Sequence, residues 1–177
     1  LNSFLQLSMS IINSPEFNPG TVGVWNELFA EPKDKSNLAG EVKKRLRAHL
    51  SNAFRRHVDE DILNGYTNYT MSKINSGISF TDSIKKAVTA SLSSPLFLYK
   101  HSSTTAKENE YALASKLSFT LWGSAPDAEL MNLAKNGALS KILPATSDRM
   151  MQDQKIDRFL DTFPAQWMQL NTILDAK

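Results

Sequence analysis

The sequence contains no cysteine, and this absence removes several classes of chemistry. Without a thiol, the 177-residue chain forms no disulfide, thiolate metal site, iron–sulfur cluster, cysteine nucleophile or covalent attachment to c-type haem. Histidine is also scarce: only His49, His57 and His101 occur, and no two of them have the spacing of a zinc-binding HExxH motif. We therefore expect no cofactor or metal in this chain itself.

Long hydrophobic runs and an excess of one charge are lacking as well. No apolar run reaches the roughly 18 residues of a membrane-spanning helix, because Ser93, Ser94 and Pro95 interrupt the longest stretch, 87–99. The 20 basic and 18 acidic residues leave a net charge of +2, which gives no general attraction to nucleic acid or anionic membrane. The chain begins at Leu1 without a signal-peptide pattern, so we expect a piece of something longer, with no membrane span.

Apolar residues are plentiful and recur at helical spacing. They make up 41% of the chain, which is enough for a core, and no run shows the long alternation of a strand. We predict an all-α fold, an irregular helical bundle of about five to seven helices. The predicted helices cover residues 3–13, 41–56, 59–75, 79–93, 108–122, 128–135 and 154–174. Two S-x-x-D capping boxes, Ser79–Asp82 and Ser124–Asp127, support helix starts there.

The chain divides into an extension and two helical domains. Residues 1–40 are rich in turn-forming types and read as a short helix with loops, and 41–100 form the first domain. The polar stretch 101–107 separates it from a second domain, 108–177, which we expect to pack as one unit with the first. The apolar segment 94–99 is predicted to be a buried junction between them.

Aromatic residues near the C-terminus predict a second core. The helix 108–122 is apolar nearly all round, which is typical of a central helix. The last helix offers the largest complementary stripe, although Pro164 should kink or divide it. We therefore predict that Trp122, Phe119, Phe163 and Trp167 share one core.

Four residues stand out as candidates for a structural or interaction role, and each has two interpretations. Arg55 and Arg56 end a basic run with Lys43, Lys44, Arg45 and Arg47 that suits phosphate or nucleic acid, or a solvated helix face. Trp122 and Trp167 suit stacking on a sugar or cofactor, or core packing. We favour the second interpretation of each pair, and we identify no catalytic, cofactor-binding or metal residue.

Other constellations are weaker. His49 is a metal or haem ligand, or an imidazole at the edge of the core, which we favour. Asp157 and Asp161, one helical turn apart, are an acid–base or metal pair, or simply face water. Asn68-Tyr69-Thr70 matches the glycosylation triplet. Neither a glycine-rich phosphate loop nor a GxSxG elbow is present.

Several motifs together resemble a known pair of domains. AFRRHVDEDIL (53–63) and SFTDSIKKAVTASLSSPLFLYK (79–100) resemble the planctomycete-type domain of unknown function 1595. YALASKLSFTLWGSAPDAELMNLAKNGAL (111–139) and RFLDTFPAQWMQL (158–170) resemble domain of unknown function 1592, its usual neighbour. The sequence departs from the pattern at His57, where proline is usual, at 152–154, where an A-D-P turn is usual, and at Pro164, where a small residue is usual.

The resemblance implies a large exported protein, in the periplasm, in which these helical domains lie beside cytochrome-c-like modules that bind c-type haem. It implies no catalytic residue for this chain. Our first hypothesis is thus a non-catalytic interaction or scaffold segment whose partners are other domains or subunits of that protein, haem-bearing ones included. The alternatives are part of a periplasmic redox enzyme whose active site other domains complete, and a basic-helix nucleic-acid binder.

Overall fold

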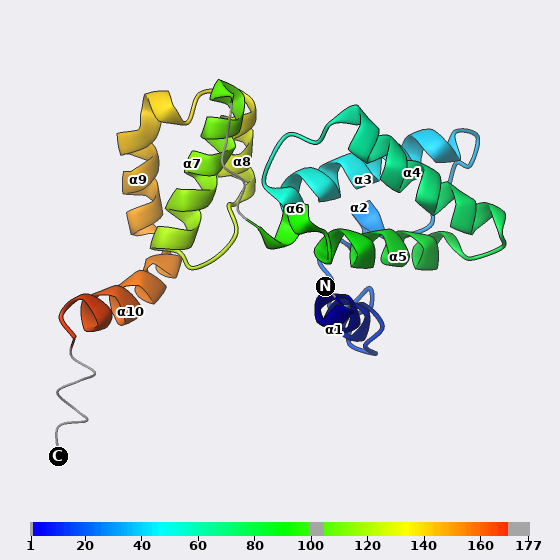
Figure 1. Ribbon diagram of the computed structural model, residues 1–177, viewed down its shortest axis with the longest axis horizontal. Coiled ribbons are helices and arrows are strands. Elements are labelled where there is room, and N and C mark those ends of the chain that lie inside the picture. The colour runs from blue at the N-terminus through cyan, green and yellow to red at the C-terminus, as the bar shows by residue number, and fades with distance from the viewer. Residues whose placement is uncertain (1, 100–104, 170–177) are drawn as a thin grey trace, which may run out of the picture. The chain divides into compact units, whose positions relative to one another are not determined.

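The computed structural model describes residues 2–99 and 105–169, in which helices are joined by turns and loops and no strand occurs (Figure 1). The predicted all-α class is confirmed. The chain divides into two compact units, Leu1–His101 and Ser102–Lys177. The expectation that both units pack as one, through residues 94–99, stays a prediction.

The first unit contains six described α-helices around one core. They are α1 (Asn2–Ile12), α2 (Trp25–Leu28), α3 (Leu38–Phe54), α4 (Glu60–Asn75), α5 (Phe80–Leu92) and α6 (Pro95–Leu98). Helices α3, α4 and α5 pack against one another, and α1 packs on α5. Residues 1–40 therefore contribute to this unit, because Ile12, Leu28 and Phe29 belong to the same core as α3.

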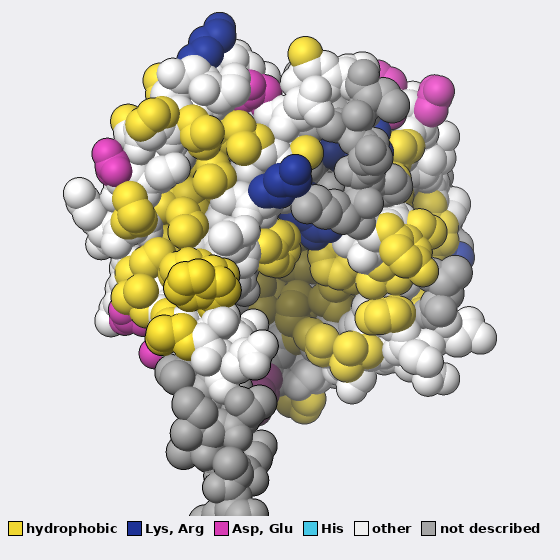
Figure 2. Space-filling view, turned by 60° about the vertical axis from the view of Figure 1, so that its left-hand side comes forward, with side chains coloured by type: hydrophobic (Ala, Val, Ile, Leu, Met, Phe, Trp, Pro, Cys, Tyr) yellow, Lys and Arg dark blue, Asp and Glu magenta, His cyan; other side chains and the backbone are white. Residues whose placement is uncertain are grey.

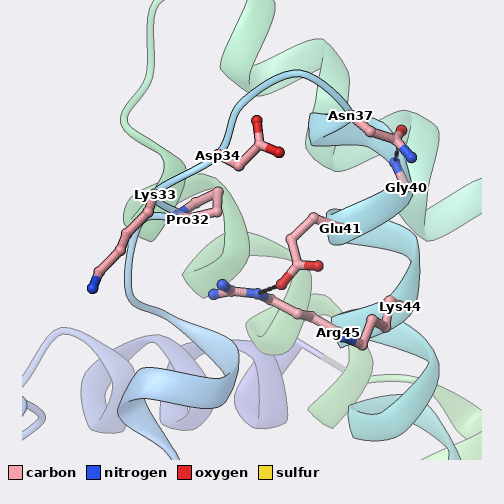
Figure 3. A pocket seen from close by; sticks show the side chains of 8 residues that line it. All are labelled: Pro32, Lys33, Asp34, Asn37, Gly40, Glu41, Lys44 and Arg45. Atoms are coloured by element: carbon pink, nitrogen blue, oxygen red, sulfur yellow. Dashed lines mark hydrogen bonds and ion pairs between the residues drawn. The ribbon is translucent and has the colours of Figure 1, made fainter.

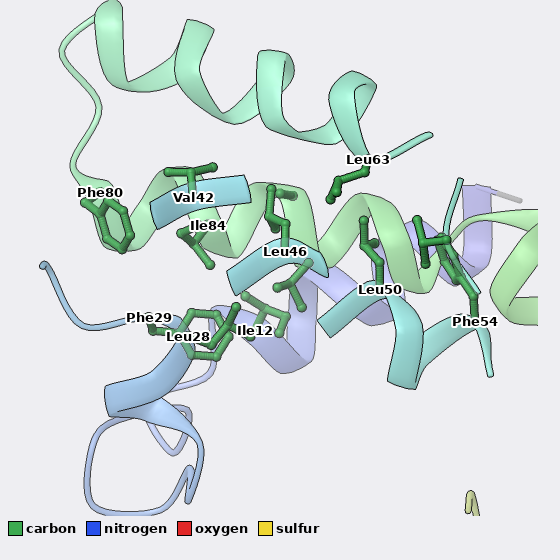
Figure 4. Close-up of a cluster of buried hydrophobic side chains, with 13 residues drawn as sticks. Ile12, Leu28, Phe29, Val42, Leu46, Leu50, Phe54, Leu63, Phe80 and Ile84 are labelled. Atoms are coloured by element: carbon green, nitrogen blue, oxygen red, sulfur yellow. The ribbon is translucent and has the colours of Figure 1, made fainter. Parts of the chain in front are cut away.

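Helix α3 forms because its apolar residues recur every four positions. Val42, Leu46, Leu50 and Phe54 follow one face of the helix (Figure 4) and are all buried. Asn37 caps the start, where its Oδ1 accepts from the Gly40 N–H at 3.0 Å. The predicted stripe of this helix is confirmed.

Capping explains where two other helices begin. At α5 the predicted box is confirmed, since the Ser79 hydroxyl accepts from the Asp82 N–H at 3.0 Å. At α8 the predicted box is wrong, because the helix begins after Asp127, whose carboxylate accepts from the Leu130 N–H. Aspartate caps well by itself, and the Ser124 position lies before the extended residues that precede the helix.

The apolar segment 94–99 packs on its own unit. The Ser94 hydroxyl caps α6 by accepting from the Leu96 N–H, and Pro95 occupies the first helical position. Leu96 and Phe97 lie against the first core, whereas the Tyr99 side chain is 65% exposed. The prediction that this segment is buried is therefore wrong, because its residues are half-buried or exposed.

The second unit contains four α-helices and two 3₁₀ turns among its described residues. They are α7 (Ala106–Leu121), α8 (Ala128–Lys135), η1 (Ser140–Ile142), α9 (Leu143–Gln152), η2 (Gln154–Ile156) and α10 (Asp157–Trp167). Helix α7 packs chiefly on α8 and also on α9. The buried core residues are Tyr111, Ala114, Trp122, Leu130, Met131, Ala134, Leu139 and Met150.

The predicted aromatic core is wrong in its membership. Trp122 is fully buried, but Phe119 is 50% exposed, Phe163 47% and Trp167 76%. Helix α7 is not wrapped on all sides, and α10 does not lay its stripe across α7. A helical period shows that a face is apolar, but it cannot show which element covers that face. Helix α10 continues through Pro164 to Trp167, and the predicted continuation to 174 lies outside the described residues.

Candidate functional site

Arg55 and Arg56 lie where α3 ends, and the structure gives Arg55 a structural task. Its backbone is left-handed, with φ of 52°, and its N–H donates to the Ser51 carbonyl. The guanidinium donates to the Phe97 carbonyl at 2.9 Å and lies 5.7 Å from the centroid of the Phe97 ring. Arg55 thus ties the end of α3 to α6, and burial lowers the pKa of this side chain.

The rest of the basic run is largely paired. Lys43 and Arg47 both form ion pairs with Glu60 at the start of α4, and Arg45 pairs with Glu41. The two ion pairs with Glu60 join α3 to α4, and the Arg45–Glu41 pair lies within α3. Lys43, Arg45, Arg47 and Arg55 thus have partners within their own unit, so among the described residues α3 presents no continuous row of cations free for a phosphate backbone.

A polar depression of about 480 Å³ lies between the loop 32–37 and the first turns of α3 (Figure 3). Among the residues that line it, Arg45 has the most hydrogen-bond partners. The Nε atom lies 2.7 Å from a Glu41 oxygen, and Nη1 donates to the Ala30 carbonyl at 2.6 Å and to that of Leu28 at 3.3 Å. The hydrogen bond from Arg45 holds the pKa of Glu41 below its usual value.

The chemistry available in this depression is limited. Lys33 and Lys44 form no ion pair with another described residue, and Asp34 accepts from the Ser36 N–H at 2.8 Å, which lowers the Asp34 pKa. The lining contains no histidine, serine or other nucleophile beside a base. The depression therefore offers an open, mixed-charge surface and no catalytic pair.

His49 and Ser91 form a buried pair that superficially resembles a base and a nucleophile. The His49 Nε2 atom lies 2.8 Å from the Ser91 hydroxyl oxygen, but that hydroxyl donates its proton to the Val88 carbonyl at 2.7 Å. The ring must then donate from Nε2, which is the opposite of the arrangement that a general base needs. Burial lowers the pKa of His49 to about 4, so the pair is a neutral tie between α3 and α5.

The structure also shows the surroundings of the two aspartates of α10 and of the glycosylation triplet. Asp157 and Asp161 are exposed on α10, and the described part of the chain has no group of three or more His, Asp or Glu that could hold a metal ion. In the glycosylation triplet, Thr70 is buried in α4 and its hydroxyl donates to the Tyr66 carbonyl. Within the described ranges, no helix has both the length and the apolar character needed to cross a bilayer.

Trp122 is the centre of the second unit. Its indole Nε1 donates to the Met150 carbonyl at 3.0 Å, and its own carbonyl accepts from Arg158 at 3.1 Å. Lys155 Nζ lies 4.4 Å from the ring centroid and the Arg149 guanidinium 5.5 Å. Because the ring is fully enclosed by its own unit, Trp122 packs and does not stack on a ligand.

Two carboxylates, Asp127 and Glu110, connect the helices of this unit, and the sequence marked only Asp127, as the last residue of a capping box. Asp127 caps α8 and also pairs with Arg149 of α9 at 2.9 Å. Burial raises the Asp127 pKa, but the Arg149 and Leu130 hydrogen bonds outweigh it and the pKa is lowered. Glu110 of α7 accepts from both the N–H and the hydroxyl of Ser140. Only the cap had a local sequence signal, since the other contacts join residues distant in the chain.

Two family models match the chain. A family described as a protein of unknown function, DUF1595, matches residues 41–101, and a second, DUF1592, matches 109–177. The chain carries a DUF1595 domain followed by a DUF1592 domain. The resemblance to these two domains is thus confirmed, and no curated protein and no solved structure matches the chain. The DUF1595 region holds α3 to α6, and the DUF1592 region holds α8 to α10 and nearly all of α7.

Trp167, in the DUF1592 region, belongs to an aromatic ladder on the surface of α10. Phe159 and Phe163 stack with centroids 4.7 Å apart and planes at 13°, and Phe163 and Trp167 stack at 6.2 Å and 10°. Leu160, in the first turn of α10, and Met168, which follows its last residue, are also more than half exposed. Figure 2 shows hydrophobic side chains gathered in broad patches on the visible face.

A second exposed apolar surface lies on α1, before the DUF1595 region. Only Ser8 and Ile12 of this helix are buried. The exposed large side chains are Phe4, Leu5, Leu7, Met9 and Ile11. No charged residue occurs before Glu16, so this helix lacks the basic face of an interfacial membrane helix.

Proposed function

We propose that this DUF1595–DUF1592 chain is a non-catalytic interaction segment of a larger exported protein, and that the ladder Phe159–Phe163–Trp167 is its principal contact surface. The observation that supports this most directly is the Trp167 side chain, 76% exposed and stacked in register with two phenylalanines. Monomeric proteins seldom leave contiguous aromatic surface in water, and tryptophan is enriched where partners bind.

The polar side chains considered as candidates support the same proposal, because each already forms a hydrogen bond or ion pair within its own unit. Arg45, Arg55, His49 and Asp127 each bind another part of their own unit. An enzyme site would need convergent polar groups aimed at an empty volume. Exposed apolar surface, on α1 as well as at the ladder, therefore remains to be explained, and burial against a partner explains it. The ladder is the one of these two surfaces that carries a tryptophan.

The partner that we propose is another domain of the same larger protein. This rests on the family resemblance, in which these helical domains lie beside cytochrome-c-like modules in exported proteins. The periplasmic location and the neighbouring haem modules are proposals on the same ground. A haem-specific absorbance scan and an intact mass of the protein purified from its source test both of them directly.

Hydrogen exchange tests the contact itself. Amides of 157–168 should exchange more slowly in the full-length protein than in the 177-residue chain, whereas those of the buried α8 should exchange equally in both. In full-length protein carrying Phe163→Ser and Trp167→Ser, the extra protection should disappear. Tyr99→Ser, at another exposed ring, is the matched control. Equal exchange of 157–168 in both proteins would contradict the proposed surface.

A further inference from the structure

The sequence contains two Asn-Gly dipeptides, and the fold places them in different surroundings. Asn64–Gly65 lies inside α4, with helix on both sides. Asn136–Gly137 lies at the end of the eight-residue helix α8, where Asn136 is the C-cap. Both asparagines are exposed. A glycine has no side chain to shield its backbone nitrogen, so the preceding amide carbon is open to attack by that nitrogen wherever the backbone can bend.

The backbone at Asn136 is the less constrained of the two. Gly137 is left-handed, with φ of +65°, and it lies beyond the last residue of α8, whereas Gly65 has helix on both sides. Its N–H donates to the Ala134 carbonyl at 3.1 Å, and the Ala138 N–H donates to that of Leu133 at 3.0 Å. These are the two bonds of a Schellman ending. Bonds in the last turn of a short helix open more readily than those inside a long one.

We propose that Asn136 is a site of spontaneous deamidation and that Asn64 is protected by its helix. The deprotonated Gly137 nitrogen attacks the Asn136 Cγ, so that a new C–N bond forms while the bond from Cγ to the side-chain nitrogen breaks. That nitrogen takes up a proton and leaves as ammonia. Water then opens the five-membered imide at one of its two carbonyls, giving aspartate or isoaspartate.

Deamidation of Asn136 would change the backbone and the charge at the end of α8, where the chain leads into the core of the second unit. Isoaspartate adds one carbon to the backbone between Asn136 and Gly137, where the spacing sets both Schellman bonds. The chain continues directly into Leu139, which is fully buried, and Ser140, which donates its N–H to Glu110. Either product also places a negative charge at the C-terminus of α8, where the helix dipole opposes it. Deamidation at this position should therefore loosen the attachment of η1 to α7.

Peptide mapping tests the proposal with a control inside the same molecule. The intact chain is aged at mildly alkaline pH, and the acid forms of the two peptides are counted by mass spectrometry. We expect deamidation at residue 136 to be at least about tenfold faster than at 64, since opening the helix interior is the slower route. In denaturing urea the two rates should become equal. Equal rates in the folded chain, or faster loss at Asn64, would overturn the proposal.

Two variants separate the effects of the products. Asn136→Ser removes the amide and should keep the unfolding temperature of aged protein unchanged. Asn136→Asp carries the charge without the added backbone carbon, so fresh Asn136→Asp should melt between the unaged protein and the isoaspartate fraction. An isoaspartate fraction as stable as the Asn136→Asp protein would contradict the backbone explanation.

Discussion

The guanidinium of Arg55 donates to the backbone carbonyl of Phe97 at 2.9 Å, across 42 positions of sequence. Because the contact is charge-assisted and partly buried, Arg55→Ala should reduce the free energy of unfolding by about 2 kcal/mol. Arg55→Gly loses the same contact but relieves the left-handed backbone, so it should cost about 1 kcal/mol less than the alanine variant. Urea unfolding measures both, with Lys86→Ala, at an exposed position of α5, as the control. A glycine variant no more stable than the alanine variant would refute the strained conformation.

His49 should make stability depend on pH. Its folded pKa of about 4 lies below the ordinary histidine pKa of 6.5, so between these pH values the unfolded chain binds a proton that the folded chain does not. Stability from this group is complete above pH 6.5, falls as pH falls toward 4, and changes by up to about 3 kcal/mol.

Comparison with His49→Gln isolates this effect from carboxylate titration, because glutamine can still donate to Ser91. The difference in unfolding free energy between wild type and His49→Gln should narrow or reverse as the pH falls from 7 to 4.5. A difference that stays constant with pH would mean that residue 49 titrates normally in the fold.

Truncation of the two tryptophans of the second unit should change the free energy of unfolding by very different amounts. Trp122→Ala empties a fully buried site and should cost about 3–5 kcal/mol. Trp167→Ala removes a ring that is 76% exposed and should change the stability of the isolated chain by less than about 0.5 kcal/mol. Thermal unfolding of the 177-residue chain distinguishes them, and a large loss from Trp167→Ala would show that α10 is packed.

Two helical glycines should differ in their tolerance of a methyl group. At Gly65 nothing lies within 4 Å of an added Cβ, so Gly65→Ala should stabilise the fold by about 0.5–1 kcal/mol. At Gly40 the Cβ would come within 2.5 Å of the Asn37 side chain, and displacing that cap offsets the gain by about 1 kcal/mol. Gly40→Ala should therefore be close to neutral.

A double mutant cycle by urea unfolding tests this explanation. In an Asn37→Ala background the cap is already lost, so adding Gly40→Ala should then stabilise about as much as Gly65→Ala does. Additive effects of Asn37→Ala and Gly40→Ala would show that the two residues do not interact.

The helices of the first unit can be predicted from the sequence because the patterns that specify them are local. The four-residue repeat from Val42 to Phe54 predicts both a helix and its buried face, and Ser79 with Asp82 predicts the next helix start. The second unit was read less well. The stripe of Phe159, Phe163 and Trp167 predicts a helix correctly, but its burial depends on a covering element that the period does not encode.

The structural roles of Arg55 and Asp127 could not be predicted from the sequence for a related reason. Arg55 looked like part of a basic patch, and its actual partner, the Phe97 carbonyl, is a backbone group that no motif marks. Asp127 is predicted only as the last residue of a capping box that begins at Ser124, and its ion pair with Arg149 depends on how α9 returns toward α8. Hydrogen bonds between distant segments follow from the assembled fold, so local patterns cannot supply them.

The packing of α1 on α5 has a kinetic consequence. Helices α3, α4 and α5 follow one another through short connections, whereas α1 ends at Ile12 and its partner begins only at Phe80. Contacts between distant positions need a larger loop to close, and they form more slowly than local ones. The three-helix assembly should therefore form first and α1 should join it last. The same helix, held by Ser8 and Ile12, should be the first to detach when the protein is warmed.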